Sequence, residues 1–118
     1  WSGANSSLII YRNASAGLEI LKGNKQPIGI FNDMQPFTSQ TIKLNEGDRI
    51  FMFTDGFADQ FGGPQGKKIM SKRMKEWITA SAKLPLNKQR EYLFQQFKDW
   101  MRDHEQIDDV CLIAFELE

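Results

Sequence analysis

The stretch RIFMFTDG, residues 49–56, decides how this chain folds. Every position from Ile50 to Phe53 is apolar, so neither face of an extended strand would be polar. Such an unbroken run is typical of a strand that is covered on both faces in the middle of a layered domain. The run VCLIAF, residues 110–115, has the same character near the end of the chain. We predict that these two segments are the central strands of one sheet.

Three shorter strands are predicted before the stretch at 49–56. Residues 8–11 and 18–22 lie on either side of a polar turn that contains Gly17, which predicts a hairpin. Residues 41–44 alternate between polar and apolar in the manner of a further strand. With the two central strands, the sequence therefore predicts about five strands.

Two helices are predicted between the central strands, because the apolar period changes there. Ser71 is expected to cap the first helix and Asn87 the second, with Pro85 separating them. The apolar faces consist of Met74, Trp77 and Ile78 in the first helix, and of Leu93, Phe97, Trp100 and Met101 in the second. We interpret both faces as core packing that covers one side of the sheet.

The length and charge of the chain limit the classes of function. A chain of 118 residues suits one domain, residues 1–118, and its 15 basic residues balance its 15 acidic ones. A net charge of zero gives no reason to expect nucleic acid or an anionic membrane as a partner. Cys111 stands alone and is predicted to be a small buried residue, so a reducing, cytoplasmic setting is expected.

Acidic residues stand where each central strand meets the edge of the sheet. Asp55 directly follows the first strand and precedes Gly56, whereas Asp108 and Asp109 directly precede the second strand. If the two strands are antiparallel neighbours, these acids lie on the same edge. Carboxylates grouped without Cys or His suit a hard cation such as Mg²⁺ or Mn²⁺. The alternative, left open by the pattern, is that Asp55-Gly56 forms a turn and Asp108-Asp109 caps a strand entry.

Four motifs carry a resemblance to a known family. FTDGFADQFGG at residues 53–63 is similar to the Thr-Asp-Gly motif of the protein phosphatase 2C-like (PP2C-like) family. QIDDVCLI at 106–113 resembles that family's closing motif, SGAN at 2–5 its Gly-x-Asn segment, and QPIG at 26–29 its Pro-Leu-Gly loop. The four motifs occur in the family's order, and within the family the sequence most resembles the bacterial branch typified by sporulation stage II protein E and the sigma-factor regulatory phosphatases.

The resemblance implies an α/β (α+β) fold, an antiparallel β-sandwich flanked by helices. This chain is expected to be an incomplete C-terminal portion of the catalytic domain, with about five strands and two helices. By motif position, Asp55 and Asp108 match metal ligands. Asp109, the neighbour of Asp108, is expected either to hold a ligand in place or to be the ligand itself. Gly56 is expected to be required by the backbone conformation and not to bind metal.

The implied function is that of a metal-dependent serine/threonine protein phosphatase, in which two Mn²⁺ or Mg²⁺ ions activate a water. The implied partner is a phosphorylated regulatory protein, such as an anti-sigma factor antagonist, with a sensor region upstream in the parent protein. Nucleic acid and membrane contact are not expected of this segment. Because the family's Asp and Gly-His-Gly-type motif has no counterpart here, the segment alone is expected to be inactive. The alternative is a non-catalytic phosphatase-like interaction module in bacterial signalling.

Two further polar features have ordinary interpretations. Lys67-Lys68 is more readily a solvated loop than a receptor for an acidic phosphoprotein, although the latter stays open. His104, the only histidine, is predicted to be a solvated residue at a helix end and not an acid catalyst.

Overall fold

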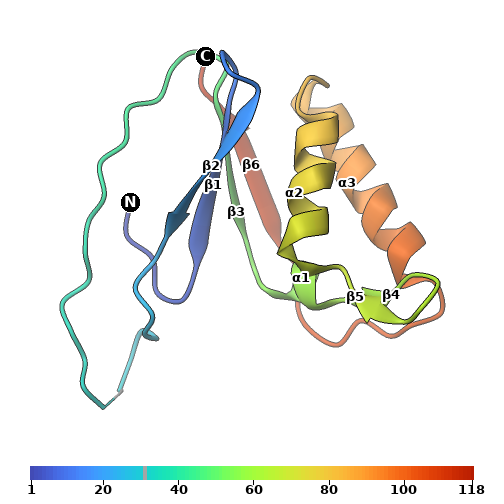
Figure 1. Ribbon diagram of the computed structural model, residues 1–118, viewed down its shortest axis with the longest axis horizontal. Coiled ribbons are helices and arrows are strands. Elements are labelled where there is room, and N and C mark those ends of the chain that lie inside the picture. The colour runs from blue at the N-terminus through green and yellow to red at the C-terminus, as the bar shows by residue number, and fades with distance from the viewer. Residues whose placement is uncertain (31) are drawn as a thin grey trace.

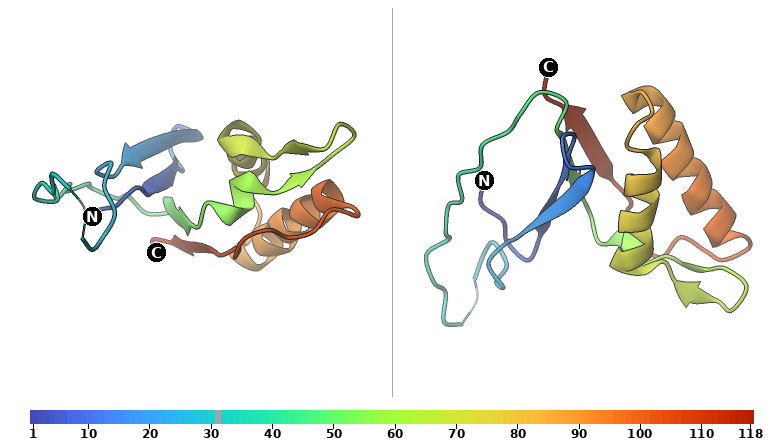
Figure 2. Two further views of the ribbon diagram at one scale, coloured as in Figure 1. Left: turned by 90° about the horizontal axis from the view of Figure 1, so that it is seen from below. Right: turned by 45° about the horizontal axis from the view of Figure 1, so that its top comes forward.

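A computed structural model describes residues 1–30 and 32–118. The helices cover one face of an antiparallel sheet, and an extended segment runs past the opposite face (Figure 1 and Figure 2). No helix in the described part of the chain is long and apolar enough to cross a membrane.

The main sheet has four strands in the order β2-β1-β3-β6, and every neighbouring pair is antiparallel. Their bounds are Ser7–Arg12 (β1), Gly17–Lys22 (β2), Arg49–Phe53 (β3) and Leu112–Glu116 (β6). The predicted hairpin of β1 and β2 is confirmed, with Ser7 opposite Lys22 and Arg12 opposite Gly17. The predicted pairing of the two main apolar strands is confirmed as well, since Phe53 lies opposite Leu112.

Three helices and a small hairpin lie between β3 and β6. They are α1 (Gly56–Asp59), β4 (Phe61–Gly62), β5 (Lys67–Lys68), α2 (Met70–Ser81) and α3 (Leu86–Met101). The two long helices have the apolar faces that the sequence predicted. The predicted caps are wrong, because Ile69 and Pro85 occupy the capping positions while Ser71 and Asn87 lie inside the first turns. Neither observed cap uses a side-chain hydrogen bond, so packing fixes where these helices begin.

Two apolar clusters lie on the two faces of the sheet. The helix-facing cluster combines Ile9, Tyr11 and Phe51 of the sheet with Phe57, Met74, Ile78, Leu93 and Phe97 of the helices. The opposite cluster contains Leu8, Ile10, Leu21 and Ile50, against which Trp1, Ile42 and Leu44 pack. Strand β1 is therefore buried on both faces, as its four central residues show.

Two strand predictions are wrong. Residues 41–44 form no strand; Ile42 and Leu44 pack on the sheet, but their backbone joins no ladder. Strand β6 is an edge strand among the described residues and is covered on one face only. Because side chains alternate along a strand, Leu112 and Ala114 face the helices, whereas Ile113 lies on the other face and is 53% exposed.

Cys111 is also placed differently from its prediction. It is exposed and not buried. The residue precedes β6 and has the same parity as Ile113, so alternation directs it away from the helices. An apolar sequence context therefore did not distinguish the covered face of β6 from the uncovered one.

A buried carboxylate joins two turns at the far end of the sheet. Asp48 is 2% exposed and accepts hydrogen bonds from the backbone N–H of Asn45 at 2.9 Å and of Asn13 at 3.0 Å. Arg12 donates to the same carboxylate at 2.8 Å. These donors, the Asn45 N–H above all, hold the pKa of Asp48 below its usual range despite its burial.

We predict that Asp48→Asn lowers the free energy of unfolding at pH 7 by about 1–3 kcal/mol, because buried donors lose a charged acceptor. Between its lowered native pKa and the ordinary Asp pKa of about 4, Asp48 stays ionised in the folded protein while the unfolded chain binds a proton. The contribution of ionised Asp48 to stability is therefore complete only above the ordinary pKa. It is lost as the pH falls through the lower native pKa. Urea unfolding at a series of pH values should show the two proteins converging below about pH 4.

The exposed Asp99 on α3 provides the control. Asp99→Asn should change the free energy of unfolding by less than about 0.5 kcal/mol, because the exposed carboxylate accepts one surface hydrogen bond, from the Gln95 side chain at 2.7 Å, which an asparagine oxygen can also accept. A difference between the unaltered protein and Asp48→Asn that stays constant down to pH 2 would contradict the role of ionised Asp48.

Candidate metal centre

The acidic residues predicted to bind metal come together at one end of the β3–β6 pair. Strand β3 ends at Phe53 and leads through Thr54 and Asp55 into α1, while Asp108 and Asp109 lead into β6. In Figure 1 this is the end of the sheet at which β3 passes into α1. The antiparallel pairing thus joins segments that are more than 50 positions apart in the sequence.

Thr54 fastens the two segments to each other. Its hydroxyl donates to the carbonyl oxygen of Asp109 at 2.9 Å and accepts the backbone N–H of Cys111 at 2.9 Å. Its own backbone N–H donates to the Cys111 carbonyl oxygen at 2.9 Å. Sequence reasoning did not single out this positioning residue. The only available signal was a hydroxyl directly before the acid of the Thr-Asp-Gly motif.

Gly56 allows the closest approach between the segments. A Cβ at this position would overlap the carbonyl oxygen of Asp109 and lie 3.3 Å from the Cβ of Asp108. Glycine is therefore required here because a neighbouring backbone lies too close for a Cβ, and not because the backbone angles are unusual. Any side chain here would separate Asp55 from the pair at 108–109.

We predict that Gly56→Ala lowers the free energy of unfolding by about 1–3 kcal/mol, the usual range for overpacking a closely packed position. Gly17→Ala is the matched control, since a Cβ there would meet only the Ser15 hydroxyl oxygen at 3.4 Å. The control should change stability by less than about 0.5 kcal/mol. Equal urea midpoints for the two variants would contradict the close contact at Gly56.

The α1 turn is anchored by one aromatic side chain. Phe57 is 3% exposed, and its ring centroid lies 5.2 Å from that of Phe97 and 6.2 Å from that of Trp77. Asp55 occupies the position before this turn, and its carboxylate makes no capping hydrogen bond to it. The Asp55 carboxylate is exposed and is not used to stabilise α1.

The closing pair has a defined local geometry. One carboxylate oxygen of Asp108 accepts the backbone N–H of Asp109 at 2.7 Å, and the side chain of Gln106 donates to the Asp108 carbonyl oxygen at 3.0 Å. Both acids are exposed. These contacts hold the loop without using the carboxylate of Asp109.

The donor set fits part of a hard-cation centre. The residues at this edge offer carboxylate oxygens, which suit Mg²⁺ or Mn²⁺. Within residues 1–30 and 32–118, however, no three acidic, histidine or cysteine side chains are grouped closely enough to hold a metal ion. The chain therefore supplies some ligands of such a centre, and the ligand roles of Asp55, Asp108 and Asp109 stay predictions.

The other polar residues singled out in the sequence lie outside this edge. The ammonium of Lys68 pairs with Asp59 at 3.4 Å, while Lys67 is exposed in the same hairpin. His104 is exposed just beyond α3, and its backbone N–H donates to the Met101 carbonyl oxygen at 2.9 Å. The structure thus places His104 at a helix end, as predicted.

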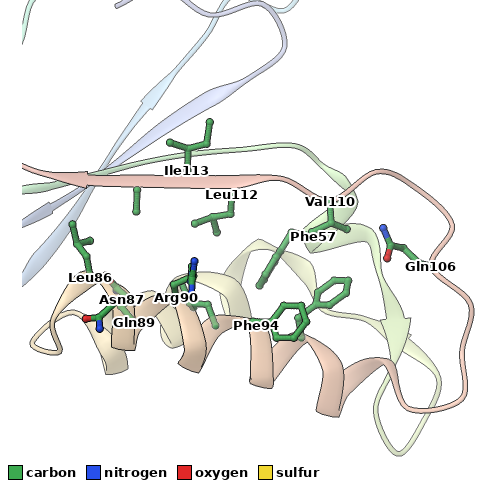
Figure 3. A pocket seen from close by; sticks show the side chains of 13 residues that line it. Phe57, Leu86, Asn87, Gln89, Arg90, Phe94, Gln106, Val110, Leu112 and Ile113 are labelled. Carbon is green, nitrogen blue, oxygen red and sulfur yellow. The ribbon is translucent and has the colours of Figure 1, made fainter.

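An apolar groove adjoins the same edge. It lies between α3 and β6, has a volume of about 660 Å³, and is bounded near the acids by Phe57 and Val110 (Figure 3). Phe94 projects from α3 along it and is 63% exposed. Its lining contains no acidic or hydroxyl side chain, so it adds no carboxylate to the acids at the edge.

Comparison with known proteins identifies the family of this arrangement. The model of the family described as "Stage II sporulation protein E (SpoIIE)" matches residues 1–118. The chain belongs to the SpoIIE family. No curated protein matches it.

Two solved structures are similar to this SpoIIE-family chain. The SiaA-PP2C domain of Pseudomonas aeruginosa is 28% identical with a TM-score of 0.88, and the match covers 99% of this chain and 45% of that one. The PP2C phosphatase domain of SpoIIE from Bacillus subtilis, solved with a fragment of its regulatory domain, is 20% identical with a TM-score of 0.67. That match covers 96% of this chain and 32% of the other.

These findings confirm the resemblance to PP2C-like phosphatases of the SpoIIE branch and the α+β fold class. The chain spans less than half the length of the solved chains that it matches. Its general class is that of a PP2C-like phosphatase domain.

Proposed function

We propose that this chain forms part of a metal-dependent serine/threonine protein phosphatase, in which Asp55 and Asp108 ligate Mn²⁺ or Mg²⁺. The observation that carries the proposal is the contact of Gly56 with Asp108-Asp109, which brings acids from two distant segments to one edge. Asp109 is the neighbour that supports or replaces Asp108 as a ligand. Membership of the SpoIIE family supports the phosphatase class.

The residues of this chain would act by holding charge in fixed positions. Thr54 ties Asp55 to the 108–109 loop, and Phe57 anchors the turn that follows Asp55. Bound cations in such a centre supply an activated water and neutralise phosphoryl oxygens. Since phosphoryl transfer depends mainly on positioning and charge stabilisation, the chain needs no nucleophilic side chain.

The rest of the ligand set would come from residues outside this chain. The solved relatives are more than twice as long as the part that is matched, and the described residues contain no group of three ligands. We therefore place the activity in a longer domain that extends upstream of Trp1, called the extended domain below. Residues 1–118 alone are expected to be inactive.

The substrate class and cellular setting follow from the same proposal. The extended domain would hydrolyse phosphoserine or phosphothreonine on a regulatory protein, for example an anti-sigma factor antagonist. A sensor region would lie upstream, and the phosphatase part would face the cytoplasm.

A second candidate is a non-catalytic phosphatase-like interaction module. The absence of a three-ligand group in the described part of the chain favours it. The retention of Asp55, Asp108 and Asp109 at one edge favours the enzyme, because a module that only binds partners has no need of exposed acids there.

The test is metal-dependent hydrolysis of a phosphoserine peptide by the extended domain. Phosphate release should require Mn²⁺ or Mg²⁺, stop when a chelator is added, and return when metal is restored. A folded extended domain that releases no phosphate with either metal would favour the interaction module.

A further inference from the structure

A basic groove lies between the β4–β5 hairpin and the start of α2, with a volume of about 840 Å³. We call it the hairpin groove and define it by Phe61, Lys67, Lys68, Met70, Lys72 and Arg73. We propose that the hairpin groove docks an acidic segment of the phosphorylated protein substrate. The inference rests on the proposed function, because it names how the substrate of that site is recognised.

The groove is held rigidly by Trp100 of α3. The Gly63 backbone N–H donates to the Trp100 carbonyl oxygen at 2.7 Å, and the indole N–H donates to the Lys67 carbonyl oxygen at 3.0 Å. Cβ atoms on Gly62 or Gly63 would collide with Trp100. The hairpin is therefore fixed to the end of α3, so a ligand would not have to order it on binding.

Positive charge is concentrated in the groove although the chain as a whole is neutral. Four of its residues are cationic, against Glu76 in the lining and Asp59 beside it. Asp59 pairs with Lys68. In the described part of the chain, Lys67, Lys72 and Arg73 have no ion-pair partner. Three cations thus remain to receive carboxylates.

Arg73 is presented in a fixed orientation. Its guanidinium carbon lies 4.0 Å from the centroid of the Trp100 ring, and one guanidinium nitrogen donates to the Ile69 carbonyl oxygen at 3.3 Å. A guanidinium held over an indole by a cation–π contact still has N–H groups free to donate to a ligand. Those N–H groups suit the planar carboxylate of an aspartate or glutamate.

Apolar side chains stand beside these cations. Met70 is 59% exposed and Phe61 is 38% exposed. Met70 also has a positive φ of 66°, which is unfavourable for a residue with a Cβ. A strained residue that presents a flexible apolar side chain to solvent suits a contact surface better than a structural position. The groove therefore fits a segment with acidic residues and at least one apolar residue.

The groove lies close to the candidate metal centre along the chain. Asp55 and Phe61 are joined by the single turn of α1 and Gln60. An extended peptide of about six residues is long enough to connect the two, since only the five residues 56–60 of the chain itself lie between them. We therefore expect the acidic residues within about six positions of the phosphorylated residue.

Nucleic acid is a poorer fit than an acidic peptide. Glu76 and Asp59 would face phosphates at the same surface, and the net charge of the chain is zero. A polyanion that is bound mainly through its phosphates requires a more extended basic surface.

The experiment measures peptide binding and catalysis separately in the extended domain. The probes are a fluorescent peptide with glutamates within six positions of a serine, and the same peptide with glutamine in their place. The test variant Lys67→Glu/Lys72→Glu changes two exposed residues of the groove. The control Lys88→Glu/Lys98→Glu makes the same change of charge at exposed positions of α3 outside the groove.

Fluorescence anisotropy should show that the test variant binds the glutamate peptide about tenfold more weakly than the unaltered domain does, as expected for reversing two exposed charges. Binding of the glutamine peptide should change less than about twofold, and the control variant should bind like the unaltered domain. The test variant should still hydrolyse p-nitrophenyl phosphate at the unaltered rate, because that substrate is too small to reach the groove.

Equal affinities of the test and control variants for the glutamate peptide would overturn the inference. Binding of a single-stranded oligonucleotide that is lost only in the test variant, with peptide affinity unchanged, would overturn it in favour of nucleic acid. Failure of the unaltered domain to release phosphate from a phosphoserine peptide with either metal would instead overturn the proposed function, and the anisotropy result would still decide the groove.

Discussion

Replacing Asp55 by asparagine should reduce the Mn²⁺-dependent hydrolysis of a phosphoserine peptide by the extended domain about a thousandfold or more. An amide keeps the size of the carboxylate but removes its charge, so the cation loses a ligand that attracts it. A thousandfold loss corresponds to about 4 kcal/mol of transition-state stabilisation, the size of effect that we expect for losing one anionic ligand of a phosphoryl-transfer centre. Asp108→Asn should have an effect of the same order.

The control for this experiment is an exposed aspartate outside the edge. Asp103 lies in the turn after α3, so Asp103→Asn should retain full activity. The stability of Asp55→Asn should also match that of the unaltered domain, because the carboxylate of Asp55 does not cap α1. Full activity in both Asp55→Asn and Asp108→Asn would contradict the assignment of these residues as metal ligands.

Asp109 can be distinguished from Asp108 by the same measurement. The Asp109 carbonyl oxygen holds Thr54, and its backbone N–H is bound by the carboxylate of Asp108. Both contacts use the backbone of Asp109, so Asp109→Asn preserves them and tests the carboxylate alone.

Local patterns predicted the elements that pack on one another. The apolar run at 50–53 became the main part of β3, the hairpin of β1 and β2 formed in the expected place, and the helical spacing of apolar residues identified α2 and α3. These features follow from side-chain alternation and helix periodicity, which depend on neighbours in the sequence.

The errors concern properties that neighbours in the sequence do not determine. The run at 110–115 is as apolar as that at 50–53, yet β6 lies at an edge and leaves Ile113 and Phe115 partly exposed. Residues 41–44 have the pattern of a strand, but two of their side chains cover the sheet without pairing with it. Strand pattern indicates which side chains are apolar and does not indicate which partner covers them.

The acidic residues of the candidate site could be predicted from the sequence, whereas the contacts that hold their two segments together could not. Asp55 and the pair Asp108-Asp109 were visible because they stand within two positions of the end of one apolar run and the start of the other. The Thr54 hydroxyl donates a hydrogen bond to the Asp109 carbonyl oxygen, and Gly56 packs against the same residue. Both contacts join positions more than 50 apart in the sequence, so only the folded chain reveals them. Asp48, buried at the other end of the sheet, was missed for the same reason.

Replacing Phe57 by alanine should cause the largest loss of stability of any change near the site. The side chain is almost fully buried between Phe97 and Trp77, and Phe→Ala changes in such positions cost about 3–5 kcal/mol. That is a large part of the 5–15 kcal/mol that usually stabilises a domain. Urea unfolding of the extended domain, followed by tryptophan fluorescence, would measure the loss.

Phe94→Ala is the matched control, because Phe94 on α3 is mostly exposed. It should lower the free energy of unfolding by no more than about 0.5 kcal/mol. Equal losses in Phe57→Ala and Phe94→Ala would contradict the anchoring of α1 by Phe57.

The milder Phe57→Leu separates stability from function. Leucine still fills much of the site, so this variant should stay folded with a loss of about 1–3 kcal/mol. A four-residue helix has little stability of its own and depends on its packing. The weaker anchor should therefore let Asp55 move relative to Asp108, which lowers the affinity for Mn²⁺ even though both carboxylates are present. A Phe57→Leu domain that binds Mn²⁺ as tightly as the unaltered protein would show that Thr54 and Gly56 position Asp55 without the aromatic anchor.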